Sequence, residues 1–238
     1  MRFVIALLLM LLATPVYGNA NTPDDVMAVQ ALIEKFDTPG IVVTEDGRTV
    51  PAFVVYAEAV AAYGDCAVDP LIVALEEEGQ VRVAAAIALD MIGPASIKAK
   101  PQLVVLLNSS VDRDNILACG VIRGIGSSAA ELVPLVREQL YHKNFHVQYW
   151  ACRALASIGP GAHAATEDLC ERLGTGVASV RRNAAIALGS IAPGMTLRQL
   201  QETVNVLEVT KLRDECHPVR IEAVAALAKI AEFQAQVD

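Results

Sequence analysis

One helical segment recurs along the chain at a fixed interval, and this repetition limits the possible folds more than any other feature. Copies at 81–93, 114–126, 147–159 and 180–192 lie 33 residues apart, and a last copy at 219–231 follows after 39. The first shared column is valine except at Asp114, the second is alanine, and the other two are leucine or isoleucine. Members of the last three columns are Ala85, Ala118, Ala151, Ala184 and Ala223; Leu89, Ile122, Leu155, Leu188 and Leu227; and Ile92, Ile125, Ile158, Ile191 and Ile230. Their spacing of i, i+4, i+8 and i+11 predicts an amphipathic helix with one buried face.

A second helix is predicted before each copy of the segment. The copies end at stops such as Gly93-Pro94 and Gly159-Pro160, after which the chain can turn and begin a new helix. The preceding helices are expected to start at or near Asp69-Pro70, Lys100-Pro101, Ser128, Ala165 and Thr196. The repeating unit is therefore a pair of helices, and stacked pairs of this kind share a continuous core.

The repeated strings resemble a known family. VRVAAAIALDMIG, VQYWACRALASIG, VRRNAAIALGSIA and VRIEAVAALAKIA are similar to the second helix of HEAT repeats, most closely the short bacterial form in phycobilisome-lyase-like proteins. The resemblance covers residues 66–233 and implies an all-α fold, an α-α superhelix. We expect a right-handed HEAT/armadillo-like solenoid of about five helix pairs with an N-terminal capping pair. Such stacks serve many unrelated roles, so the resemblance leaves the function open.

The first residues have the order of a secretory signal peptide. Arg2 precedes an unbroken apolar run at 3–13, and Pro15 and small residues follow it. We assign residues 1–20 to the signal, with cleavage after Gly18 or Ala20. The apolar run is shorter than the roughly 20 residues that a membrane-spanning helix needs. No later stretch is expected to span a membrane either, so we expect a periplasmic or secreted protein.

Residues 21–65 fit the repeat poorly and are predicted to cap the HEAT-like stack formed by 66–238. Helices are expected at 22–36 and 51–63, with an irregular insert at 37–50 between them. Within the insert, 41–50 forms either a small hairpin or a plain loop.

The five cysteines contain no CxxC spacing, and their odd number leaves their pairing open. Cys119 and Cys152 occupy matching places on neighbouring helices. Such helices lie about 8–10 Å apart, whereas a disulfide needs Cα atoms within about 7 Å, so we predict that these two are not bonded.

No active site is predicted, and neither a cofactor nor a metal is expected. With 19 basic and 27 acidic residues, the chain carries a formal net charge of −8 and no basic cluster, which argues against a nucleic-acid partner. His142 and His146 have a metal-ligand spacing, but they straddle a predicted turn. Gly120 and Gly124 lie inside a predicted helix, where each costs about 1 kcal/mol relative to alanine. We favour a tight helix contact at these glycines.

The predicted binding surface is a strip of second-helix residues opposite the buried columns. Its candidate contact residues are Ile116, Arg123, Tyr149, Arg153, Arg182 and Ile186. The resemblance implies that second helices line the concave face of the stack. Exposed apolar surface, a tyrosine and several arginines are typical of binding hot spots, and the arginines could receive a carboxylate. The alternative is that strong curvature buries part of the strip. Trp150 is assigned to its flank, packed between repeats.

The predicted function is a non-catalytic scaffold that binds a protein or peptide on the concave face, in the periplasm or outside the cell. Two alternatives stay open. One is a lyase-like enzyme or chromophore-handling protein, by analogy with the bilin lyases that are built from similar repeats. The other is a structural subunit that associates with itself.

Overall fold

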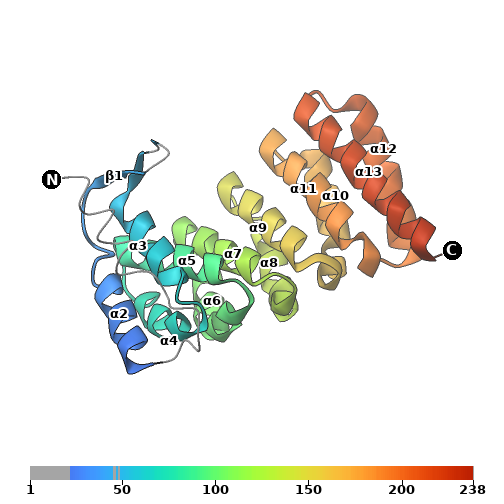
Figure 1. Cartoon of the computed structure of the whole chain (residues 1–238). Helices are drawn as coiled ribbons and strands as arrows, with labels where there is room; N and C mark the ends of the chain where they lie inside the picture. Colours follow the sequence, from blue (N-terminus) through green and yellow to red (C-terminus); the bar gives the residue numbers. More distant parts are fainter. Residues whose placement is uncertain (1–21, 45–46, 48, 238) are drawn as a thin grey trace. The chain divides into compact units, whose positions relative to one another are not determined.

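The computed structural model describes residues 22–44, 47 and 49–237, and nearly all of their regular structure is helical (Figure 1). The predicted signal peptide at 1–20 lies outside the described residues. The chain divides into two compact units, Met1–Gln102 and Leu103–Asp238. Each unit is built from paired helices, which confirms the all-α repeat fold.

The first unit begins with a helix pair joined by a hairpin. Helix α2 (Pro23–Ile33) starts at Thr22, whose side chain forms a reciprocal capping box with Asp25. Strands β1 (Ile41–Val43) and β2 (Thr49–Pro51) then pair antiparallel, and α3 (Ala52–Ala61) follows and packs against α2. The described residues of this segment therefore pair as the two strands of a hairpin, the first of the two predicted alternatives.

The next pair is α4 (Asp65–Ala74) and α5 (Gly79–Ile92). The expected helix start at Asp69-Pro70 is wrong, because α4 begins at Asp65 and contains Pro70 in its interior. The helix can start this early because the chain turns at Gly64, whose φ of 59° lies in the left-handed region that glycine favours.

The second unit has two layers of helices. One layer holds the second helices of the repeats, α7 (Asp112–Ile125), α9 (Phe145–Ile158), α11 (Ala178–Ile191) and α13 (His217–Val237), which lie side by side (Figure 1). The other layer holds the first helices, α8 (Val133–Gln139), α10 (Thr166–Thr175) and α12 (Leu197–Arg213). Helix α6 (Lys100–Leu107) stands at the boundary of the two units.

The first-helix starts agree with the sequence except at one place. Helix α6 begins at Lys100, α10 directly after Ala165, and α12 after its Thr196 cap. The expected start at Ser128 is wrong, because 126–132 forms the 3-10 segment η2 (Gly126–Leu132) and α8 begins only at Val133. Similar 3-10 segments, η1 (Pro94–Ala99), η3 (Gly159–Ala165) and η4 (Ala192–Gly194), follow α5, α9 and α11.

The four repeated columns form the core, as their spacing predicts. All five alanines of the second column are fully buried. Only Val81, Ile92 and Leu227 among the columns are half-buried instead of buried. Asp114 is also buried in the valine column, where its carboxylate accepts a hydrogen bond of 2.7 Å from the hydroxyl of Ser109. A buried carboxylate is tolerated there because it has a hydrogen-bond donor.

One run of helix among the described residues, Asp112–Gln139, is long and apolar enough to cross a membrane by length and composition, with a mean hydropathy of 1.5. This finding concerns length and composition only, so the expectation that no later stretch spans a membrane stays a prediction. Gly126, with a φ of 66°, interrupts the run between α7 and α8. Val121 and Ile122 of α7 are fully buried in the second unit, so apolar residues of α7 form part of its hydrophobic core.

Candidate binding site on the second-helix layer

A hollow of about 490 Å³ opens on the second-helix layer of the second unit, over α7, α9 and α11. Its lining residues are Arg123 of α7; Tyr149, Arg153, Ala156 and Ser157 of α9; and Arg182, Asn183 and Ile186 of α11. Five of the six residues predicted from the sequence thus meet at one place. The sixth, Ile116, is half-buried and does not line the hollow. It lies two helical turns before Arg123, which is about 10 Å along the axis of α7.

Two aromatic rings and one arginine form a cluster at the hollow, which Tyr149 and Arg153 line and Trp150 does not. The rings of Tyr149 and Trp150 meet edge to face, with centroids 5.8 Å apart. The Arg153 guanidinium carbon lies 5.6 Å from the Tyr149 centroid and 4.8 Å from the Trp150 centroid. Arg153 Nη1 also donates a hydrogen bond of 3.3 Å to Tyr149 Oη. Arg153 follows Trp150 by three residues and Tyr149 by four on the same helix, so α9 alone positions the cluster.

Trp150 does not line the hollow, in agreement with its predicted place on the flank between repeats. It is half-buried, and a second guanidinium lies over its ring: the Arg123 guanidinium carbon is 6.0 Å from the ring centroid. Two arginines from adjacent repeats therefore share one indole ring, an arrangement that cation–π attraction favours. The backbone carbonyl of Arg123 accepts a hydrogen bond of 2.6 Å from Ser157 Oγ, which links α7 to α9.

The third arginine of the site is already neutralised. Both Nε and Nη2 of Arg182 donate to Glu222 Oε1 of α13, at 3.0 and 2.6 Å. Sequence reasoning missed Glu222 because it lies 40 residues away from Arg182 along the chain. Arg153 differs from Arg182, because none of its contacts among the described residues is to a carboxylate.

Part of the predicted strip is accessible around the hollow, as a binding surface requires. Another part is buried, as the alternative of strong curvature predicted. Tyr149, Arg153 and Ile186 are half-buried around the hollow, and Gly189 is buried further along α11. A Cβ atom added at Gly189 would lie 2.9 Å from the Cα of Ala226 in α13, so these two helices approach closely.

The tight contact that we favoured at Gly120 is wrong. A Cβ atom added there would meet nothing within 4 Å. Gly120 is thus a helical glycine whose added Cβ would meet open space, in contrast to Gly189.

Groups typical of catalysis do not converge on the hollow. Its eight lining residues include no histidine, cysteine or carboxylate. Among the residues that the structure describes, no group of three possible metal ligands occurs; His142 lies in the turn from α8 to α9, whereas His146 lies in α9. All five cysteines are free thiols in the structure, and burial raises the pKa of both Cys119 and Cys152 to about 12.

Comparison with known proteins agrees with the repeat fold. Residues 101–189 match the family model for HEAT repeats. No curated protein sequence matches the chain.

Solved structures with similar folds cover almost the whole chain. An engineered protein from the Northeast Structural Genomics Consortium is 23% identical with a TM-score of 0.59, covering 94% of this chain and 96% of its own. A HEAT-like repeats protein from the archaeon Thermococcus onnurineus NA1 is 15% identical with a TM-score of 0.54, covering 98% and 92%. A computationally designed armadillo repeat protein for modular peptide recognition is 18% identical with a TM-score of 0.57, covering 94% and 98%. At these identities the likeness concerns the fold, which is that of a HEAT/armadillo-like helical solenoid.

Proposed function

We propose that this HEAT-like repeat protein is a non-catalytic scaffold that binds a peptide or protein partner in the hollow over α7, α9 and α11. The observation that carries the proposal is that Tyr149, Arg123 and Arg153 line one open cavity, while the Trp150 ring contacts both of these arginines. Tyrosine, tryptophan and arginine are the residues enriched at binding hot spots, because each combines a large apolar surface with a directional polar group.

The size and rigidity of the site also support a binding role. A volume of about 490 Å³ falls in the range of pockets that hold a small ligand or a few side chains. The lining residues come from regular helices whose alanine and leucine columns are fully buried, so the site is held in shape before a ligand arrives. A similar fold is used for modular peptide recognition in the designed armadillo protein.

We further propose that the protein works outside the cytoplasm, in the periplasm or beyond. The support is the order of charged, apolar and small residues in the first 20 positions. A partner would then be another exported or envelope protein.

The binding role is tested by selecting displayed peptides on the purified protein and on a Tyr149→Ala/Arg153→Ala variant. We expect peptides that bind the unaltered protein and lose at least about tenfold in affinity on the variant, because two hot-spot side chains are removed. The control is Arg198→Ala, which removes an exposed arginine of α12 that lies outside the hollow. Thermal melting should show that all variants stay folded, since Tyr149 and Arg153 are only half-buried. Equal binding to both proteins, or no enriched peptide, would rule out the hollow as the binding site.

A further inference from the structure

We propose that the hollow recognises an extended peptide through an acidic side chain, whose carboxylate binds the guanidinium of Arg153. This inference rests on the proposed function, because it names the ligand class of the same site. It is carried by the contacts of Arg153, by the charge of the lining and by the apolar surface beside it.

Arg153 is a cation held in place without an anion. Its guanidinium lies over the rings of Tyr149 and Trp150, and its contacts among the described residues include no carboxylate. Arginine stays charged at every relevant pH, and it binds carboxylates through two parallel hydrogen bonds. The two aromatic faces restrict its side chain, so less conformational entropy is lost when a ligand binds.

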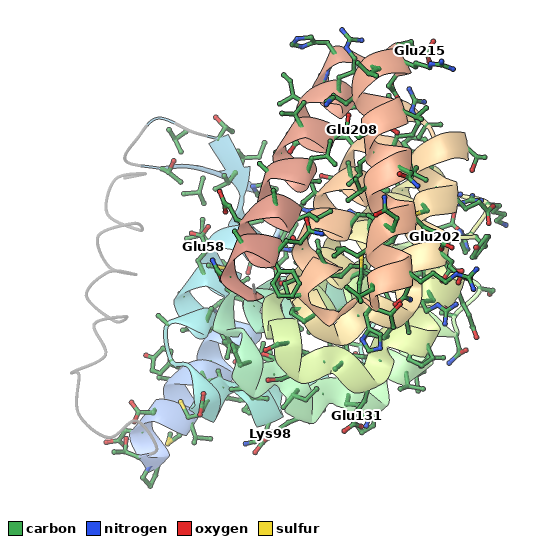
Figure 2. The ribbon with its side chains drawn as sticks, turned by 90° about the vertical axis from the view of Figure 1, so that its right-hand side faces the viewer. Glu58, Lys98, Glu131, Glu202, Glu208 and Glu215 are labelled. Carbon is green, nitrogen blue, oxygen red and sulfur yellow. The ribbon has the colours of Figure 1, made fainter. Side chains whose placement is uncertain are left out.

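The charge around Arg153 favours an anion further. The lining contains three arginines and no acidic residue, and Glu222 of α13 binds Arg182. The chain as a whole carries a net charge of −8, and Figure 2 shows acidic side chains such as Glu202, Glu208 and Glu215 on the C-terminal helix pair instead. The hollow is thus a positive spot on an acidic protein. Such a spot attracts a carboxylate and repels a lysine or arginine side chain.

The apolar surface beside the arginine indicates a peptide and not a small free anion. Ile186 lines the hollow on α11 in the place that Arg153 holds on α9, and Ile221 of α13, which corresponds to Arg182, is 52% exposed. Packed helices lie about 8–10 Å apart. A polyproline-II peptide advances about 3.1 Å per residue and returns to the same face every third residue, or about 9 Å. A peptide with an acidic residue over Arg153 of α9 would therefore place an apolar residue, three positions away, over Ile186 of α11.

The sole tryptophan of the chain, Trp150, reports on this site through its contact with Arg153. The probes are three synthetic peptides of about nine residues, capped at both ends, in a Gly-Ser background. Each has leucine three residues before and after a central residue, which is Glu, Gln or Lys. Trp150 emission is followed as each peptide is titrated into the full mature protein. We expect a saturable change with the Glu peptide, and an affinity at least about tenfold higher than that of the Gln peptide, because one charge-assisted pair is lost. The Lys peptide should bind more weakly still.

Variants link the preference to the arginine. Arg153→Gln keeps the polar side chain but removes the charge, so it should abolish the preference for Glu over Gln. Arg198→Gln changes the net charge equally at an exposed site and should leave the preference intact. Arg153→Lys should retain part of the preference, since it keeps the charge without the paired donors, and it serves if Arg153→Gln fails to fold.

Two outcomes overturn the carboxylate proposal. One is equal binding of the Glu and Gln peptides, or no binding of either. The other is a preference for Glu that survives in Arg153→Gln. If displayed peptides nevertheless bind through Tyr149 and Arg153 and contain no required acid, the binding function stands and the ligand class is wrong. If neither set of peptides needs the hollow, both proposals fail.

Discussion

A matched pair of glycine substitutions provides the sharpest test of how the helices of the second unit pack. Gly120 in α7 and Gly189 in α11 both lie inside helices, where alanine is favoured over glycine by about 1 kcal/mol. In Gly120→Ala the new methyl group meets open space, since nothing lies within 4 Å of it. The free energy of unfolding should therefore rise by about 1 kcal/mol, which raises Tm by about 2–4 °C for a chain of this size.

Gly189→Ala has the same propensity gain but a steric cost. The new Cβ would lie 2.9 Å from the Cα of Ala226 and 3.1 Å from its Cβ, so α11 and α13 must separate. Overpacking of this kind costs about 1–3 kcal/mol, and the net change ranges from none to a loss of about 2 kcal/mol. Alanine itself suits this column, because Ala156 occupies it in α9. The destabilisation expected for Gly189→Ala therefore comes from the contact with Ala226 of α13 and not from the helical conformation of α11.

The pair is compared by urea unfolding and by thermal melting, with circular dichroism as a check that helix content is unchanged. We expect Gly189→Ala to be at least about 1 kcal/mol less stable than Gly120→Ala. If Gly189→Ala is as stable as Gly120→Ala, the close approach of α11 and α13 is wrong.

Two further predictions concern an ion pair and the N-terminus. Asp214 accepts hydrogen bonds of 2.8 and 2.9 Å from Arg181, which lowers the pKa of its carboxyl. This stabilisation is present above the unfolded pKa of about 3.9 and is lost as pH falls through the lower folded value. Asp214→Asn should therefore lose up to about 3 kcal/mol at neutral pH and progressively less as the pH falls below about 4, and a loss that does not change with pH would contradict this. An exported chain should begin at Asn19 or Asn21 by mass spectrometry, and a chain that keeps Met1 would refute cleavage.

The helical repeat could be predicted because its causes are local. A residue's place on the face of a helix depends only on its spacing, so the recurring alanines identified the buried stripe of every second helix. The first helices were harder to predict, because they have no shared columns. Pro70 was taken for a helix start, whereas Gly64 turns the chain and starts α4 earlier.

The candidate site was predictable in membership but not in geometry. Angular position on the helix selected Tyr149, Arg153 and three other residues that line the hollow. It also selected Ile116, because the angle around an axis says nothing about the distance along it. It placed Trp150 on the flank, but the position of this ring beside the guanidinium groups of Arg123 and Arg153 could not be read from the angle.

The sequence by itself therefore determined the helices, their buried faces and the strip on which a ligand site could form. Only the tertiary structure decided which arginine of the strip is available to a ligand. Arg182 is neutralised by Glu222 from the next repeat, whereas Arg153 lies over two rings of its own helix and contacts no carboxylate among the described residues. Spacing along the chain sets which face a side chain occupies. The partner of a charge depends on distances between helices, which no repeat period contains.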